Sequence, residues 1–302
     1  MSTGRRQAVQ PTPTAGLRSP VVRRWVAAVL GLVLCAGAVG CGGSDDDTAD
    51  GERQDAEPAP VLEAALRRST LFDTRREIGL ALATTGDADV RLGTIQLITP
   101  LFETLAPTAR DATLAAGDRA RVMPIPYGTA RCDGAEEDAP EIAAVVDGEE
   151  VRVPVTEHPA DLLANLHDRE CASAAVLEDV SLELTGAWTV TDPYTAEGQL
   201  TVTQRTSGVT AEVDEVLGNV IFGATTATAS PVLAVDDDQP SASVGVTISA
   251  ARCDPHALTE YKRTFVFVVE VRVGDGDPVR VDVVAAGDAH AALSELLRSC
   301  VA

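Results

Sequence analysis

The sequence Ala130-Arg131-Cys132-Asp133 opens the stretch that decides the expected fold, because Ala251-Arg252-Cys253-Asp254 opens a second copy of it. Each copy continues through an Asp-Gly pair and a Val-Arg-Val run to a leucine-rich segment shortly before another cysteine. The matched segments are Asp147–Val153 with Asp275–Val281, Leu163–Leu166 with Leu293–Leu296, and Cys171 with Cys300. This duplication predicts two tandem units that share one architecture.

Short strands are expected to dominate both units. Apolar residues alternate through Ile78–Leu82, and Asp147-Gly148 lies between two apolar runs, which is a strong signal for a β-hairpin. Pro124 and Pro126 indicate an edge strand, because proline lacks the N–H that a central strand donates. About seven such strands followed by one helix are typical of an immunoglobulin-like sandwich. We therefore predict a mainly β chain with two tandem immunoglobulin-like antiparallel sandwiches, each ending in a short helix.

The two units are assigned to residues 61–172 and 173–302. The second unit is expected to begin near Val176–Glu178, since the same Val-Leu-Glu sequence stands at Val61–Glu63, where the first unit begins. The helix that closes the first unit is expected to open at Pro159, because proline is tolerated at the first position of a helix.

Four of the six cysteines fall in the two units, and four cysteines allow three connectivities. The repeat favours Cys132–Cys171 and Cys253–Cys300, since these pairs close equivalent loops, whereas the other pairings would cross-link the units. Each disulfide would join a terminal helix to the strand end at Arg-Cys-Asp. A structural metal site is the alternative, but its cysteines normally come in close pairs such as Cys-x-x-Cys, which the chain lacks.

Residues 1–40 have the pattern of a secretory signal. A polar segment ends in Arg23-Arg24 and is followed by the apolar run Trp25–Gly40. This run is shorter than the roughly 20 residues that a membrane-spanning helix needs. An uncleaved anchor and a twin-arginine signal remain alternatives.

The exit of this signal, Ala38-Val39-Gly40-Cys41, resembles the lipobox of bacterial lipoproteins, of the kind found on uncharacterised exported proteins of high-GC Gram-positive bacteria. The resemblance covers residues 1–41 only. It implies that Cys41 is lipidated, palmitate included, and that the protein is anchored on the outer face of the cytoplasmic membrane. Ala38 departs from the leucine usual in a lipobox. An ordinary signal peptidase acting after Ala38 would instead release a secreted protein.

Residues 41–60 are predicted to form a disordered acidic tether, because Asp, Glu, Gly, Thr and Pro predominate and too little apolar surface is present to fold. The whole chain carries a formal net charge of −22 at pH 7. Such an excess of acid argues against nucleic acid as a partner. It fits a solubilising role, or a cationic ligand or basic envelope partner.

No catalytic constellation is recognisable in the sequence. The motifs G-x-S-x-G, G-x-G-x-x-G, H-E-x-x-H and the P-loop are absent, so we assign no catalytic residue, metal ligand or cofactor. Surface or capping roles are expected for the histidines, which are His158, His167, His256 and His290. Asp236–Asp238 is interpreted as a turn rather than a calcium site. Trp188 is interpreted as a core residue. Arg131 and Arg252 are expected to form a local ion pair or hydrogen bonds that close the strand end, rather than a paired anion site.

These observations favour a membrane-anchored, non-enzymatic envelope interaction or accessory protein. The alternatives are an extracytoplasmic ligand- or cation-binding module and an envelope hydrolase with its carboxylates hidden among many acids. Ligand-binding residues cannot be assigned from the sequence. The segments to inspect are those in which the two copies differ, Asp254–Arg263 and Gly186–Gly198, and the surface between the modules.

Overall fold

A computed structural model of the chain describes residues 62–68, 72, 76–134, 139–158 and 161–301. All of them lie within the compact region Glu57–Ala302, which contains both repeated units. The signal-like segment, Cys41, the tether, Val61 and Pro159 lie outside the described residues. As predicted, the fold is mainly β, with 51% strand and 17% helix. No helix in the described ranges is long and apolar enough to cross a membrane.

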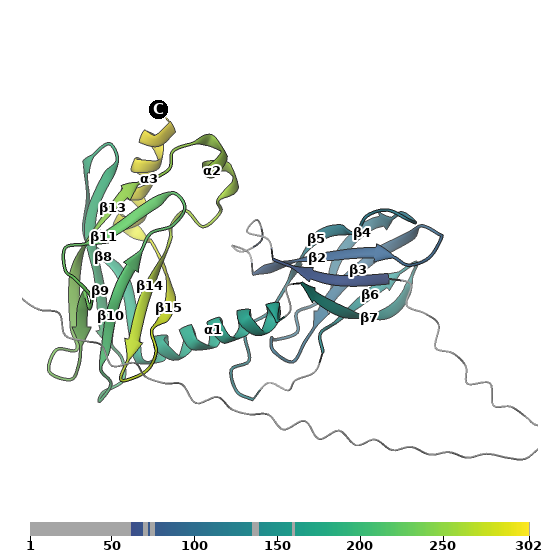
Figure 1. Ribbon diagram of the computed structural model, residues 1–302, viewed down its shortest axis with the longest axis horizontal. Coiled ribbons are helices and arrows are strands. Elements are labelled where there is room, and N and C mark those ends of the chain that lie inside the picture. Colours follow the sequence, from purple (N-terminus) through teal and green to yellow (C-terminus); the bar gives the residue numbers. More distant parts are fainter. Residues whose placement is uncertain (1–61, 69–71, 73–75, 135–138, 159–160, 302) are drawn as a thin grey trace, which may run out of the picture. The chain divides into compact units, whose positions relative to one another are not determined.

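The strands of the first unit join into one hydrogen-bonded sheet with the order β4-β3-β6-β7-β1-β2-β5 (Figure 1). They are β1 (Leu62–Arg67), β2 (Glu77–Thr84), β3 (Val90–Ile98), β4 (Thr108–Leu114), β5 (Arg121–Pro126), β6 (Glu141–Val146) and β7 (Glu149–His158). Paired strands are antiparallel except β1 and β7, which are parallel. The strands surround one apolar cluster, so the arrangement is sandwich-like.

The predicted hairpin is confirmed, with β6 and β7 joined by Asp147-Gly148. Both loop residues have positive φ, 53° and 92°, as a two-residue type I′ turn requires. The Asp147 carboxylate also accepts a hydrogen bond from the Arg91 backbone N–H at 2.9 Å, which ties the turn to β3. The two prolines of the predicted edge strand lie in β5, which is indeed at one edge of the sheet.

The helix that closes the first unit is longer than predicted. α1 (Leu162–Asp179) has 18 residues and leads directly into β8 (Val180–Asp192). Val176–Glu178, near which the second unit was expected to begin, therefore lie in α1, and the prediction of a short first helix is wrong. The segment Cys171–Ala175 contains no glycine or proline and is rich in alanine, the strongest helix former, so the helix continues past the disulfide. The predicted boundary between residues 172 and 173 falls within α1.

α1 supplies side chains to two hydrophobic clusters. Leu163, in its first turn, is 1% exposed and belongs to the cluster of the first unit, whereas Val176 is 5% exposed and belongs to the second. The carbonyl of Asp179 accepts hydrogen bonds from the backbone N–H groups of Arg205 and Thr206, at 2.7 and 3.3 Å. These bonds fix the end of the helix to the residues that follow β9.

Two four-stranded sheets build the second unit, with the orders β11-β13-β9-β8 and β12-β10-β14-β15 (Figure 1). The remaining elements are β9 (Thr195–Gln204), β10 (Ala211–Leu217), β11 (Phe222–Thr226), β12 (Leu233–Val235), β13 (Ser241–Ala250), α2 (Pro255–Glu260), β14 (Val266–Val273), β15 (Val279–Val284) and α3 (Gly287–Val301). All of these strand pairings are antiparallel. Both sheets and α3 contribute to one core in which valine is frequent and few aromatic rings take part.

Both predicted disulfides are present. Cys132 is bonded to Cys171 of α1, and Cys253 is bonded to Cys300 of α3. The pairs span 39 and 47 residues, and closing loops of this size stabilises the folded state by about 4 kcal/mol per disulfide in the chain-entropy model. Each disulfide therefore fastens a helix to the end of a strand region of its own unit.

The backbone beside the two disulfides is also matched. The N–H of Arg131 donates to the carbonyl of Leu101 at 2.9 Å, and the N–H of Arg252 donates to the carbonyl of Ile221 at 3.2 Å. A fully buried phenylalanine follows each acceptor residue. The repeated residues thus mark a joint at which a strand end, a preceding loop and a terminal helix meet.

Trp188 lies against the backbone of β9. The positive φ of Gly186, 75°, and a register shift between Thr185 and Thr189 form a bulge in β8. A Cβ atom placed on Gly198 would lie 2.1 Å from Cε2 of Trp188, so the indole ring covers this glycine. The ring also packs against the second core, in agreement with the interpretation of Trp188 as a core residue.

We predict that Gly198→Ala destabilises the protein by about 1–3 kcal/mol, because the new methyl group must displace the indole ring. Gly245→Ala, on the adjacent strand β13, is the matched control, since its Cβ would meet no atom within 4 Å. This control should change stability by less than about 0.5 kcal/mol. Urea unfolding followed by tryptophan fluorescence measures both effects, and equal effects would contradict the packing described.

Candidate functional site

The second unit departs from the first directly after the repeated Ala-Arg-Cys-Asp sequence. Asp254 caps α2, accepting a hydrogen bond from the backbone N–H of Ala257 at 2.9 Å, and Pro255 occupies the first turn. This bond is the main reason that the pKa of Asp254 lies below its usual value. At the matching place in the first unit, Asp133 is followed by Gly134 with φ 65°, and residues 135–138 lie outside the described residues. The segment in which the two sequences differ thus begins with a helix in the second unit.

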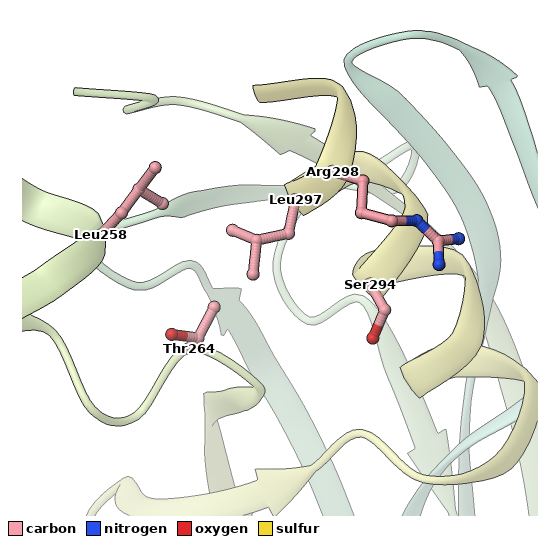
Figure 2. Close-up of a pocket in the computed structure, with 5 residues that line it drawn as sticks. All are labelled: Leu258, Thr264, Ser294, Leu297 and Arg298. Carbon is pink, nitrogen blue, oxygen red and sulfur yellow. The ribbon is translucent and has the colours of Figure 1, made fainter. Parts of the chain in front are cut away.

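α2 and α3 line a cavity of about 240 Å³ (Figure 2). The lining residues are Leu258, Thr264, Ser294, Leu297 and Arg298. In Figure 2, Leu258 and Leu297 point toward each other across the cavity, while the Arg298 guanidinium extends away from Leu258. The lining near the two leucines is thus apolar, with the hydroxyl groups of Thr264 and Ser294 at its side. Such a cavity fits a small apolar group better than a charged one.

Ser294 also approaches a histidine. Its Oγ lies 3.4 Å from Nδ1 of His290, one turn earlier on α3, and the imidazole packs against the ring of Phe265 with centroids 4.3 Å apart. An activated nucleophile needs a shorter hydrogen bond to its base and a third group that orients the base. Within the described residues, no carboxylate bonds to His290. The pair therefore lacks the geometry of an acyl-transfer site.

A second hollow, of about 270 Å³, lies over β3, β6 and β7 of the first unit. Its lining includes Thr94, Gln96, Val145 and Arg152. Nε2 of Gln96 donates to the carbonyl of Leu105 at 2.7 Å, which holds the following loop beside the hollow. The mixture of small, polar and charged side chains does not select one ligand class, so this hollow is secondary to the cavity beside α2.

The two repeated arginines have different surroundings. The side chain of Arg252 pairs with Asp254 at 3.1 Å, which confirms the local ion pair predicted there. For Arg131, no side-chain ion pair is present within the part of the chain that the structure describes, and its backbone N–H instead donates to the Leu101 carbonyl at 2.9 Å, which is the hydrogen-bond alternative of the prediction. A matched role for the two side chains is therefore not observed.

Among the described residues, no group of three or more His, Cys, Asp or Glu side chains could hold a metal ion. Asp236–Asp238 forms the predicted turn, in which Oδ1 of Asp236 accepts a hydrogen bond from the backbone N–H of Asp238 at 2.9 Å. The backbone N–H of Gly208 donates to Asp237 and lowers the pKa of that carboxyl. Asp236 is thus engaged within its own loop, and Asp237 by Gln204 and Gly208 at the end of β9 and in the loop that follows it.

The histidines divide into expected and unexpected cases. His256 pairs with Glu260 on the surface of α2 at 3.3 Å, as expected. His158 belongs to β7, but its side chain lies outside what the structure describes. His167 is unexpected, because its side chain is only 14% exposed and lies 3.5 Å from Sγ of Cys171.

Sequence reasoning missed α2 and the position of His167. The signal for α2 was present, because Asp254-Pro255 is the usual order of an N-cap residue and a first-turn proline. The signal for His167 was its place four residues before Cys171, which puts both side chains on one face of a helix.

The comparisons with known proteins identify no family. No protein-family model and no curated protein matches the chain. Among solved structures, a protein of unknown function from Porphyromonas gingivalis is 13% identical, with a TM-score of 0.21 over 76% of this chain and 100% of that chain. Red sea bream transglutaminase is 13% identical, with a TM-score of 0.22 over 76% of this chain and 32% of that chain. Scores this low carry no argument about fold or function.

We predict that Asp254→Ala frays α2, because the N–H of Ala257 loses its acceptor, whereas Asp254→Asn keeps an oxygen in place and preserves the helix. Hydrogen–deuterium exchange of residues 255–260 should rise several-fold in the alanine variant only. Because the pKa of Asp254 is lowered on folding, its stabilising effect is complete above 3.8 and is lost as the pH falls through the lowered value. Equal exchange in both variants at pH 7 would contradict the cap.

Proposed function

We propose that this chain is an exported lipoprotein, anchored through Cys41 to the outer face of the cytoplasmic membrane, where it acts as a non-enzymatic interaction or accessory protein. The observation that carries the proposal is the order of parts along the chain. A lipobox-like sequence and an acidic segment precede a body in which disulfides fasten two helices. Disulfides persist in oxidising compartments outside the cytoplasm, which supports export. Acyl chains on Cys41 would hold the protein, each buried CH₂ contributing about 0.8 kcal/mol.

The strand pairing supports two immunoglobulin-like modules. In the second unit, the orders β8-β9-β13-β11 and β10-β14-β15 reproduce the ABED and CFG sheets of that fold, with β12 added beside β10. In the first unit, β2 pairs with β5, as strands B and E do in that fold. β3 pairs with β6, and β6 pairs with β7, as strands C, F and G do. Modules of this kind are common in cell-surface proteins that bind other proteins. That association favours an interaction role over an enzymatic one.

The cavity beside α2 is the proposed contact point. It is lined in part by α2, in the segment in which the two copies differ in sequence, so the repeated sequence does not require it. Leu258 and Leu297 are partly buried, and an apolar side chain of a partner protein inserted between them would lose contact with water. The net charge of −22 favours a partner with basic residues around that apolar group.

The second candidate function is an extracytoplasmic ligand-binding module. The same cavity favours it, because about 240 Å³ approaches the lower end of the volumes that small-molecule sites have. The ligand would be a small apolar molecule, since the apolar part of the lining faces the cavity.

Cys41→Ser should abolish incorporation of a fatty-acid probe during growth, because only a lipidated cysteine at this position carries the anchor. Cys35→Ser is the matched control and should leave labelling intact, since this residue lies within the signal that cleavage removes. In-gel detection of the probe on the purified protein gives the result. Labelling that survives Cys41→Ser would refute the anchor.

Leu258→Ser together with Leu297→Ser should reduce recovery of crosslinked envelope proteins by about fivefold or more, because two buried apolar contacts are lost from the interface. Val284→Ser removes an apolar side chain that is 63% exposed and lies outside the cavity, so it should leave recovery unchanged. The measurement is quantitative mass spectrometry of proteins that co-purify after crosslinking. Unchanged recovery in the double variant would exclude the cavity as the contact point.

A further inference from the structure

His167 lies against the first disulfide. Its Nε2 is 3.5 Å from Sγ of Cys171 and 3.0 Å from the backbone carbonyl oxygen of Arg131. A carbonyl oxygen only accepts hydrogen bonds, so Nε2 carries a hydrogen and donates it. The side chain is 14% exposed, and its ring meets the ring of Phe102 edge-on with centroids 6.0 Å apart. A hydrogen-bond donor is thus held beside one sulfur of the disulfide.

The second disulfide has no such neighbour at the matching place. Counting back from the cysteine places Leu296 where His167 stands, and counting forward from the matched pair Leu166 and Leu296 places Leu297 there. Leu296 is fully buried in the second core and Leu297 packs against it, so a leucine takes the place of the histidine in either alignment. A leucine fills this position in a helix that packs on a β core, so the fold does not require a polar group there. The histidine is therefore a difference between the two copies that the shared fold does not require.

The two sulfurs of the first disulfide also differ in access. Cys132 is exposed, whereas Cys171 is half-buried on α1 beside the histidine. Both cysteines of the second disulfide, Cys253 and Cys300, are half-buried. Cys132 is therefore the most exposed of the four disulfide-bonded cysteines, and we expect a thiolate from solution to reach it most easily.

We propose that Cys132–Cys171 is a thiol-reactive disulfide, in which low-molecular-weight thiols attack Cys132 and Cys171 departs as a thiolate that His167 stabilises. Exchange is faster when the departing thiolate is more stable. A hydrogen bond donated to a thiolate favours the charged form, and Nε2–H of His167 is placed to donate one. The inference is independent of the lipid anchor and of the cavity beside α2.

The reaction balances in two exchange steps. The thiolate of the first small thiol forms a bond to Sγ of Cys132, the Cys132–Cys171 bond breaks, and its electron pair stays on Sγ of Cys171. A second thiolate then attacks the small-thiol sulfur of the mixed disulfide, which releases Cys132 as a thiolate and a small-molecule disulfide. Two thiols are thus oxidised while the protein disulfide is reduced, and the two cysteine thiolates take up protons from water.

Reduction of this disulfide would affect α1, the helix that contributes side chains to both cores. Cys171 lies between Leu163, which belongs to the first core, and Val176, which belongs to the second. The ion pair between Arg76 and Glu170 of α1, at 2.8 Å, would remain after reduction, whereas the one hydrogen on Nε2 of His167 would be shared between the Arg131 carbonyl and the Cys171 thiolate. The modification would therefore loosen, rather than detach, this part of α1.

The test uses the oxidised full-length protein with limiting dithiothreitol, timed alkylation, and mass spectrometry of each cysteine pair. Cys132–Cys171 should open about tenfold faster than Cys253–Cys300, which is the internal control. His167→Leu, the residue of the second copy, should slow the opening of Cys132–Cys171 roughly fivefold and leave Cys253–Cys300 unchanged. His290→Leu on α3 is the matched control and should change neither rate.

His167→Gln keeps an N–H donor and should therefore retain part of the fast opening rate of Cys132–Cys171. This variant tests the role of the histidine if His167→Leu fails to fold. Equal opening of the two disulfides in the wild-type protein would overturn the proposal. So would an unchanged rate in folded His167→Leu, because exposure of Cys132 alone would then explain the reactivity.

Discussion

The joint between a strand end and a terminal helix is the constraint on which the rest of the structure depends. In each unit, a loop carbonyl accepts the backbone N–H of an arginine, and the next residue is a cysteine bonded to the helix. Neither helix is itself part of a sheet, so its position is set by apolar contacts, by hydrogen bonds such as those at the end of α1, and by this covalent link. With an aromatic content of only 3%, the cores consist mainly of Val, Leu, Ile and Ala, which bury less area per side chain than aromatic residues do. A disulfide at the joint adds stability to cores that contain few aromatic side chains.

The same joint explains where the two copies can differ. The disulfide does not constrain the sequence that follows the cysteine, and this sequence differs between the two copies. After Cys132 it turns at Gly134, whereas after Cys253 it forms α2 with Asp254 as its cap. The helix facing the joint varies as well, with a histidine beside Cys171 and leucine at the matching place before Cys300. α2 and the histidine beside Cys171, the two features proposed to bind or to react, are thus additions to the fold that the two units share.

Much of this frame could be predicted from the sequence, because local patterns encode it. Strand alternation, the Asp147-Gly148 turn and the edge prolines need only neighbouring residues, and the repeat resolved the cysteine pairing. The end of α1 could not be predicted in the same way. Val176–Glu178 resembles the start of the first unit in sequence, but the alanine-rich turn before it extends the helix through these residues.

The candidate site was predictable only as a region. The segment after Asp254 stood out because the copies differ there, yet the cavity needs α3, which lies far along the chain, to complete it. His167 was one of four histidines in the sequence, and its hydrogen bond to the Arg131 carbonyl depends on tertiary contact. Side-chain surroundings of this kind follow from the fold and not from spacing.

The central claim is that each unit is closed by its own disulfide between a strand end and a helix. Peptide mapping of the unreduced protein tests it most directly, by identifying which cysteine-containing peptides are linked. The account predicts that the peptide containing Cys132 is joined to that of Cys171, and that of Cys253 to that of Cys300. A link between Cys132 and Cys253, or between Cys171 and Cys300, would contradict it.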